Sequence, residues 1–301
     1  MNENIGLVTR IVLDKYILKD ESTGEVVEAT LRGNVKKRNN ILVGDKVTYN
    51  KSYDKNMINT LIERKNYLIR PPVANIEQLI IVLSIKDPKP DYILLDKQLI
   101  LCKQKNIKPV ICINKMDLAF NDEEVKKDIE YIKKVYANLG ISIIYLSAKQ
   151  KENIDILKEV LKGSISTFSG NSGVGKSSII KLLINKEDEL EVGSVGNKTK
   201  RGKHTTKYVK LYEVGNDSYI LDTPGFSSYE LFELNHKDLR FYYDDFLKYK
   251  CEYDDCMHVK EESSVCKIKE KVKDGRIDLL RYERYVYIFN ELKEKYEKRY
   301  K

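Results

Sequence analysis

The chain has 301 residues, 42% of them hydrophobic and 33% charged, and a formal net charge of +8. This length predicts two or three domains with ordinary apolar cores. The longest apolar run, near residues 79–85, is too short to cross a bilayer, and the first residues lack the pattern of a secretory signal. We therefore expect a cytoplasmic protein with no membrane association. The positive charge fits a polyanionic partner, although a lysine-rich protein without one would have the same balance.

Residues 1–66 are predicted to form a small barrel. Five short segments with β-forming residues are separated by turn residues, with no helical periodicity. These segments are residues 7–13, 16–18, 26–31, 46–49 and 57–62. Such spacing indicates a five-stranded barrel of the OB-fold type, whose usual ligand is an oligonucleotide. Lys36, Lys37 and Arg38 fall between strands and are either phosphate contacts or a solvated basic loop.

A second domain is predicted at residues 67–229, where strands and helices alternate. The expected strands are residues 77–83, 109–113, 143–146, 165–168, 208–214 and 218–221. One expected helix begins near Asp91, a second has Val125 and Tyr136 on one face and stops at Gly140, and two more cover residues 154–161 and 178–184. This alternation predicts a parallel sheet covered by helices on both faces, and the last two strands are expected to form a hairpin.

A glycine-rich stretch lies between the strand at 165–168 and the helix at 178–184. It fits G-x-x-x-x-G-K-[ST], in which backbone N–H groups curl around a phosphate at a helix N-terminus. The candidate residues are Gly170, Asn171, Ser172, Gly173, Val174, Gly175, Lys176, Ser177 and Ser178. Lys176 is expected to reach the β- and γ-phosphates and Ser177 to ligate Mg²⁺. The competing interpretation is a chance glycine-rich turn.

Two further motifs end neighbouring strands at the edge where open α/β folds bind ligands. The first consists of Asn114, Lys115, Met116 and Asp117. A carboxylate there can accept hydrogen bonds from guanine N1–H and N2–H₂, which adenine does not offer, so the motif favours GTP over ATP. Ser147 and Ala148 form the second motif, whose backbone is expected to contact guanine O6. Alone, an Asn-Lys-x-Asp sequence is often just a strand-to-helix cap.

The fourth motif, Asp222 to Gly225, follows the last expected strand. With it, the chain resembles the TRAFAC class of GTPases, but its motifs run in circularly permuted order, with the guanine motifs ahead of the phosphate loop. The resemblance implies that Asp222 holds Mg²⁺ through water and that Gly225 senses the γ-phosphate. Either Thr205 or Thr206 would complete the metal shell in the GTP state.

Phe226 follows Gly225, at the position where Ras-like proteins carry the glutamine that orients the attacking water. An apolar side chain cannot orient water. We therefore expect slow intrinsic GTP hydrolysis that depends on a partner or on another residue such as His204.

The region 230–301 is expected to be mainly helical and to bind zinc. Its candidate ligands, three thiolates and one imidazole, suit a tetrahedral structural ion, and they are Cys251, Cys256, His258 and Cys266. The competing interpretation is three reduced cysteines and a surface histidine.

Two residue patterns follow the candidate metal ligands. Four alternating lysines at 267–273 are either solvated or a phosphate-binding face, and we favour the second. An aromatic stripe at 282–296 has helical spacing, and we expect it to pack in a core.

The barrel, the permuted GTPase motifs and the cysteine–histidine cluster together resemble the small ribosomal subunit biogenesis GTPase family RsgA, of the YjeQ/YloQ type, over nearly the whole chain. The resemblance implies a multidomain GTPase with GTP or GDP, Mg²⁺ and one structural Zn²⁺. It also implies binding to the small ribosomal subunit and its rRNA, and stimulation of hydrolysis by that subunit. The loop between His258 and Cys266 is longer than the family pattern suggests, so Cys266 is the least secure ligand.

An alternative function is a nucleotide-gated RNA-binding assembly factor of the large subunit, with incidental GTP hydrolysis. Permuted GTPases of that kind generally lack both the barrel and the zinc cluster, which favours the small subunit. We expect a monomer.

Overall fold

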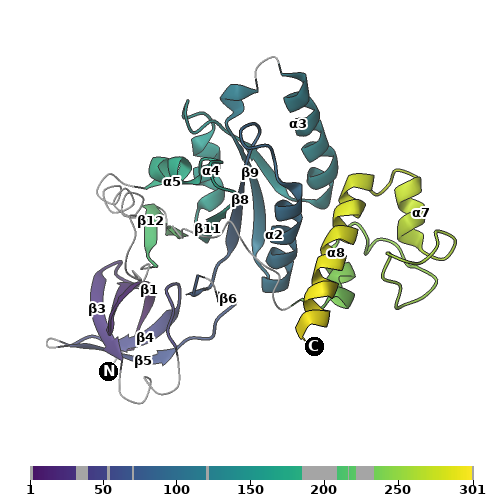
Figure 1. Ribbon diagram of the computed structural model, residues 1–301. Coiled ribbons are helices and arrows are strands. Elements are labelled where there is room, and N and C mark those ends of the chain that lie inside the picture. Colours follow the sequence, from purple (N-terminus) through teal and green to yellow (C-terminus); the bar gives the residue numbers. More distant parts are fainter. Residues whose placement is uncertain are drawn as a thin grey trace.

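The computed structural model describes residues 3–31, 40–52, 55–69, 71–119, 122–184, 209–215, 217–221 and 234–299. These residues form an N-terminal barrel, a central sheet with helices, and a C-terminal helical region, as Figure 1 shows. Within the described part of the chain, no helix is long and apolar enough to span a membrane.

The N-terminal barrel is closed and five-stranded, with the order β1-β2-β3-β5-β4. Its strands are β1 (Asn4–Val12), β2 (Lys15–Asp20), β3 (Val26–Leu31), β4 (Lys46–Asn50) and β5 (Asn56–Leu61). Strands β3 and β5 are parallel and the other neighbours are antiparallel. Val8, Leu18, Tyr49 and Ile58 fill the interior, which confirms the predicted OB-type barrel. Lys36, Lys37 and Arg38 lie outside the described residues.

The central sheet has six strands in the order β10-β9-β8-β11-β13-β12. They are β8 (Gln78–Ser84), β9 (Lys108–Asn114), β10 (Ser142–Tyr145), β11 (Ile165–Ser169), β12 (Leu211–Gly215) and β13 (Ser218–Leu221). All neighbours are parallel except β12 and β13, which form the predicted hairpin. Every residue of β8 and β11 is buried, as expected for strands covered on both faces. A short hairpin of β6 (Tyr67–Leu68) and β7 (Val73–Ala74) connects the barrel to this sheet.

Two helices cover each face of the sheet (Figure 1). Helices α2 (Tyr92–Lys105) and α3 (Glu123–Tyr136) pack on the side of Leu79 and Ile81. Helices α4 (Ile154–Leu161) and α5 (Lys176–Leu183) pack on the side of Ile80 and Val82. This alternation along one strand follows from the two-residue period of a β-strand. A short 3₁₀ turn, η1 (Met116–Leu118), follows β9, and another, η2 (Ala137–Leu139), follows α3.

The C-terminal region contains η3 (His236–Tyr242), α7 (Lys267–Lys273) and α8 (Leu279–Arg299). Residues 243–266, between η3 and α7, form no helix or strand and contain the cysteine–histidine cluster, and the rest of the region is mainly helical, as predicted. Tyr285, Phe289 and Leu292 of α8 are buried in a cluster with Leu239 and Phe246, which confirms that the aromatic stripe packs.

The lysines of α7 have partners within the C-terminal region. Lys269 Nζ donates to the carbonyl oxygens of Val259 at 2.9 Å and Glu261 at 2.6 Å. The largely buried Lys271 pairs with Glu270 at 2.7 Å and with Asp274 at 3.0 Å. The ammonium groups of these two lysines therefore have partners within the fold, and the phosphate-binding face stays a prediction.

Candidate nucleotide site and metal centre

The phosphate loop lies between β11 and α5, and its glycines are required by their surroundings. Gly170 has φ +140°, and a Cβ there would lie 2.1 Å from the carbonyl oxygen of Val82. Gly175 has φ +97°, and a Cβ there would lie 2.2 Å from Asn114 Nδ2. Real Cβ atoms do not approach other atoms so closely, and L-residues rarely adopt these φ values. The loop backbone therefore fits tightly against β8 and the guanine motif.

Lys176 and Ser177 occupy the first turn of α5. Lys176 Nζ donates to the carbonyl oxygens of Gly170 at 2.6 Å and Asn171 at 2.8 Å, so the ammonium group lies over the loop. Ser177 and Ser178 are exposed at the helix N-terminus, as is Ser172 within the loop. A helix N-terminus with an ammonium group and accessible hydroxyls suits a phosphate and its metal ion.

Asn114 joins three of the motifs. It ends β9, is buried, and donates from Nδ2 to the carbonyl oxygen of Val174 at 2.8 Å. Its Oδ1 accepts from the backbone N–H of Ala148 at 3.0 Å. A residue predicted from the guanine motif therefore holds both the phosphate loop and the Ser-Ala motif in place.

Asp117 and Ser147 are also brought together. Ser147 Oγ donates to Asp117 Oδ1 at 2.7 Å, so this hydrogen bond orients the carboxylate. Lys115 has φ +65° and donates from Nζ to the carbonyl oxygen of Asp87. The backbone N–H of Met116 donates to the carbonyl oxygen of Leu146 at 3.2 Å. The two guanine motifs thus form one surface at the carboxyl ends of β9 and β10.

Five predicted residues lie outside the described part of the chain: His204, Thr205, Thr206, Asp222 and Gly225. Leu221, at the end of β13, pairs with Thr167 of β11. The strand that precedes Asp222 therefore ends beside the strand that precedes the phosphate loop.

The segment after β8 also contributes to the site, although it belongs to none of the sequence motifs. Asn171 Nδ2 donates to Asp91 Oδ2 at 3.1 Å, and Asp91 also caps α2 by accepting from the N–H of Leu94. Pro88 Cδ is 3.7 Å from where a Cβ on Gly173 would lie. The location of this segment in the sequence could have indicated this role, because the segment follows a central strand, at the edge of the sheet where open α/β folds bind ligands.

The four candidate metal ligands converge in the C-terminal region. His258 Nδ1 lies 3.5 Å from the sulfur of Cys251, 3.3 Å from that of Cys256 and 3.6 Å from that of Cys266. All four donor atoms lie within 4.8 Å of one another. Tetrahedral zinc, with Zn–S of about 2.3 Å and Zn–N of about 2.0 Å, needs donor atoms roughly 3.5–3.8 Å apart. The cluster fits such an ion, and Cys266 belongs to it despite the longer loop.

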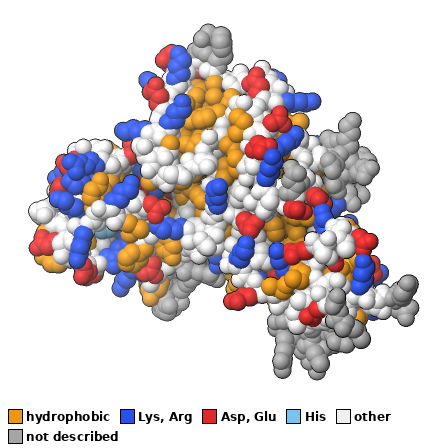
Figure 2. Space-filling view, turned by 180° about the vertical axis from the view of Figure 1, so that it is seen from behind, with side chains coloured by type: hydrophobic (Ala, Val, Ile, Leu, Met, Phe, Trp, Pro, Cys, Tyr) orange, Lys and Arg blue, Asp and Glu red, His pale blue; other side chains and the backbone are white. Residues whose placement is uncertain are grey.

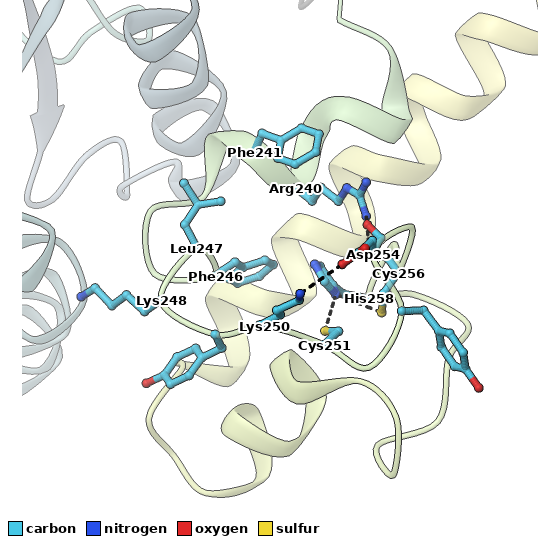
Figure 3. A pocket seen from close by; sticks show the side chains of 12 residues that line it. Arg240, Phe241, Phe246, Leu247, Lys248, Lys250, Cys251, Asp254, Cys256 and His258 are labelled. Atoms are coloured by element: carbon cyan, nitrogen blue, oxygen red, sulfur yellow. Dashed lines mark hydrogen bonds and ion pairs between the residues drawn. The ribbon is translucent and has the colours of Figure 1, made fainter.

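Hydrogen bonds hold the metal-binding segment onto α8 and η3. Tyr282 Oη donates to the carbonyl oxygen of His258 at 2.8 Å, and Tyr285 Oη donates to that of Met257 at 2.7 Å. Arg240 donates to the carbonyl oxygens of Asp254 and Cys256. Arg240, Asp254, Cys256 and His258 also line a cavity of about 330 Å³ beside the cluster, and Figure 3 shows their side chains.

The imidazole of the cluster is neutral, and the thiols need a cation beside them in order to ionise. Burial lowers the pKa of His258 to about 4, so the imidazole is neutral and able to act as a ligand at neutral pH. Burial raises the pKa of the Cys256 and Cys266 thiols. Thiolates this close together would repel one another, and a divalent cation offsets that repulsion.

Comparisons with known proteins agree with the geometry. The family model described as RsgA GTPase matches residues 61–232. A relative from Ruminiclostridium cellulolyticum, named small ribosomal subunit biogenesis GTPase RsgA, is 37% identical over 96% of this chain and 94% of its own length. A protein of the same name from Caldanaerobacter subterraneus is 39% identical over 98% of each chain. The chain belongs to the RsgA GTPase family.

Solved structures of the family have the same fold. The crystal structure of YjeQ from Thermotoga maritima has a TM-score of 0.83 and 35% identity, covering 97% of this chain and 99% of that chain. The structure of YloQ, described as a circularly permuted GTPase, has a TM-score of 0.84 and 29% identity, covering 98% and 96%. Membership in the RsgA family makes the protein a GTPase with GTP, GDP and Mg²⁺ as its ligands, and the predicted permuted fold is confirmed.

Proposed function

We propose that this protein hydrolyses GTP at the carboxyl edge of its central sheet in order to assist late maturation of the small ribosomal subunit and its own release. The observation that carries the proposal is the position of Asn114, which hydrogen-bonds both the phosphate loop and the Ser-Ala motif. In an RsgA GTPase, that arrangement joins guanine recognition to phosphate binding.

The nucleotide contacts follow from the chemistry of each group. Lys176 exchanges its loop carbonyl partners for the β- and γ-phosphates, and Ser177 ligates Mg²⁺. Asp117 reads the guanine N1–H and N2–H₂, while the backbone at Ser147 and Ala148 contacts O6. Backbone N–H groups of residues 170–178 surround the phosphates.

Hydrolysis is assigned to the segments that respond to the γ-phosphate. Asp222 holds Mg²⁺ through water, Gly225 donates its N–H to the γ-phosphate, and Thr205 or Thr206 completes the metal shell. His204 is the candidate for positioning water, since Phe226 cannot do so. Intrinsic turnover is therefore slow and rises on the small subunit.

The proposed domains are residues 1–66 for rRNA binding, 67–229 for GTP hydrolysis and 230–301 for structural zinc. Cys251, Cys256, His258 and Cys266 bind one Zn²⁺ without an open position, so the ion stabilises the fold and does no chemistry. The protein acts as a monomer in the cytoplasm. Large-subunit assembly is not favoured, because the relatives' names specify the small subunit.

The test is GTP turnover by the full chain with purified small subunits, with large subunits, and with neither. We expect slow turnover alone and stimulation by small subunits only. Stimulation by large subunits only, or fast turnover without either, would contradict the proposal. Binding to the small subunit should also weaken as salt rises, because phosphate contacts release counterions.

A further inference from the structure

Helix α2 is buried on two opposite sides. Leu95 and Leu101 pack into the core beneath the sheet, whereas Ile100 packs into the core of the C-terminal region. Figure 1 shows α2 between the strands β8 and β9 and the helix α8. A helix in this position is in contact with two parts of the protein at once.

The side of α2 that faces the sheet holds the phosphate loop at two points. Asp91 Oδ2, at the helix N-terminus, accepts from Asn171 Nδ2 within the loop at 3.1 Å. Gln98 Nε2, two turns along, donates to Ser169 Oγ at 2.5 Å, and Ser169 directly precedes Gly170. Both Gln98 and Ser169 are fully buried. Gln98 and Asp91 thus hold Ser169 and Asn171, the two ends of this turn, and a movement of α2 would shift both contacts.

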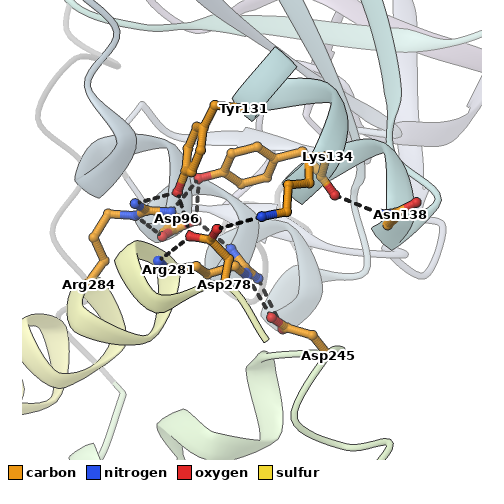
Figure 4. A network of polar contacts seen from close by, with 9 residues as sticks. Asp96, Tyr131, Lys134, Asn138, Asp245, Asp278, Arg281 and Arg284 are labelled. Atoms are coloured by element: carbon orange, nitrogen blue, oxygen red, sulfur yellow. Dashed lines mark hydrogen bonds and ion pairs between the residues drawn. The ribbon is translucent and has the colours of Figure 1, made fainter. Parts of the chain in front are cut away.

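The opposite side of α2 binds α8 through charged groups, as Figure 4 shows around Asp96. The Asp96 carboxylate is fully buried and accepts from Arg281 Nη1 and Arg284 Nε, each at 2.6 Å. It also accepts from Tyr136 Oη of α3 at 3.0 Å. One turn of the helix is thus enclosed by cations and a hydroxyl from α8 and α3.

A second ion pair joins the same two helices. Lys97 Nζ lies 2.6 Å from Glu291 Oε2, and both side chains are mostly buried. Glu291 Oε1 also pairs with Lys295 of its own helix at 3.0 Å. The buried charge of Asp96 is stable only with its guanidinium partners in place, because an unpaired buried carboxylate is strongly unfavourable. The position of α2 therefore depends on the docking of α8.

We propose that Asp91 and Gln98 are positioning residues for the phosphate loop, and that docking of α8 on the other side of α2 sets the affinity of the loop for nucleotide phosphates. This inference rests on the proposed assignment of residues 170–178 as the phosphate-binding loop. Coupling is reciprocal, so nucleotide binding also tightens the docking of α8.

The first test compares two lysines that contact the same glutamate, using the full chain with its metal. Lys97→Met removes the pair between α2 and α8, whereas Lys295→Met removes only the pair within α8. We expect Lys97→Met to weaken binding of fluorescent GDP about fivefold, a typical size for coupling between sites. Lys295→Met should leave GDP binding unchanged. Lys97→Arg keeps a cation beside Glu291, so this variant should bind GDP as tightly as the wild-type protein does.

Hydrogen exchange supplies the reciprocal measurement. Adding GDP to the wild-type protein should slow amide exchange in α8, and the slowing should be smaller in Lys97→Met. Faster exchange in α8 of Lys97→Met with unchanged GDP affinity would overturn the proposal, because α8 would then be docked without any effect on the loop.

A double-mutant cycle tests the path through α2. Asp91→Ser keeps a good helix cap but is too short to reach Asn171, and we expect it to weaken GDP binding about tenfold. If α2 carries the coupling, Lys97→Met should weaken GDP binding much less in the Asp91→Ser variant than it does in the wild-type protein. Fully additive effects would overturn the proposal. Failure of the wild-type protein to bind GDP would instead contradict the proposed function.

Discussion

The nucleotide site and the metal centre are built on different principles. In the nucleotide site, Lys176 and Asn114 are held by backbone partners within the protein, so the loop keeps its shape through its own hydrogen bonds. In the metal centre, Cys256 and His258 lie in a segment without helices or strands, where the donor atoms approach one another. The first site is formed in advance of its ligand, whereas we expect the second to depend on the proposed zinc ion for its stability.

Metal removal should have the largest effect. Structural Zn²⁺ contributes about 10 kcal/mol or more to folding of small zinc modules. We expect Cys256→Ser, or treatment with a strong chelator, to abolish stoichiometric zinc in elemental analysis and to expose α7 and α8 to hydrogen exchange.

The nucleotide site provides the control for metal removal. Its discrimination between GDP and inosine diphosphate should be unchanged, because Asp117 and Ser147 do not contact the metal centre. Loss of that discrimination, or retention of a protected α8 without zinc, would contradict the distinction between the two sites.

The preformed loop should be sensitive to an added methyl group. Gly170→Ala places a Cβ 2.1 Å from a backbone oxygen that cannot move away, in a backbone conformation suited to glycine. We expect unfolding free energy to fall by about 3 kcal/mol and GDP binding to be lost. The measurements are denaturant unfolding and fluorescent GDP titration.

Gly140→Ala is the matched control for Gly170→Ala. Gly140 has φ +74° with no atom within 4 Å of an added Cβ, so only backbone strain of about 1 kcal/mol is expected. Equal destabilisation by the two substitutions would show that the loop does not fit tightly against β8.

Guanine recognition should depend on one carboxylate. Asp117→Asn removes the acceptor for N1–H and N2–H₂, and we expect GDP affinity to fall by about 1–3 kcal/mol. Xanthosine diphosphate carries a carbonyl in place of the exocyclic amine, which the new amide N–H₂ can donate to. The variant should therefore bind xanthosine diphosphate better than GDP, and unchanged GDP preference would assign base reading to another residue.

The smallest expected effect comes from a hydrogen bond beside the metal. Tyr282→Phe removes the hydroxyl that donates to the carbonyl oxygen of His258. We expect a loss of about 1 kcal/mol in unfolding free energy and faster zinc release to a chelator. Tyr287→Phe, at an exposed position of the same helix, should have neither effect.

Much of this structure was predictable because the relevant signals are local. The strands at 26–31, 165–169 and 218–221 and the helix at 154–161 follow from short-range patterns, and their bounds match within a residue. The phosphate loop and the guanine motifs are each a continuous stretch of sequence that follows a strand. Because the strands are parallel, the motifs meet at one edge of the sheet. The cysteines and His258 form a compact sequence cluster, and their chemistry alone predicts a tetrahedral site.

The features that the sequence did not reveal depend on contacts between distant residues. In the sequence, Asp91 is recognisable only as the start of a helix. The fold brings it into contact with Asn171, which lies 80 residues away in the chain. Lys271 is largely buried and pairs with Glu270 and Asp274, which lie close to it in the sequence. An alternating pattern of lysines looks the same whether the side chains are buried in such pairs or exposed on a surface. Figure 2 shows Lys and Arg interspersed with Asp and Glu on the face it presents, so the net charge does not locate a binding surface there.

The central position of β8 has a consequence for how the protein is made. This strand is first in the chain among those of the sheet, yet it lies between β9 and β11. During synthesis, β8, β9 and β10 emerge with the guanine-reading residues and can pair before the phosphate loop has been translated. The edge of β8 that will receive β11 is meanwhile uncovered, with the apolar residues of a fully buried strand. On the proposed assignment of the motifs, the permuted order means that the base-binding residues are translated before the phosphate loop, so nucleotide can stabilise the domain only after β11 has been added.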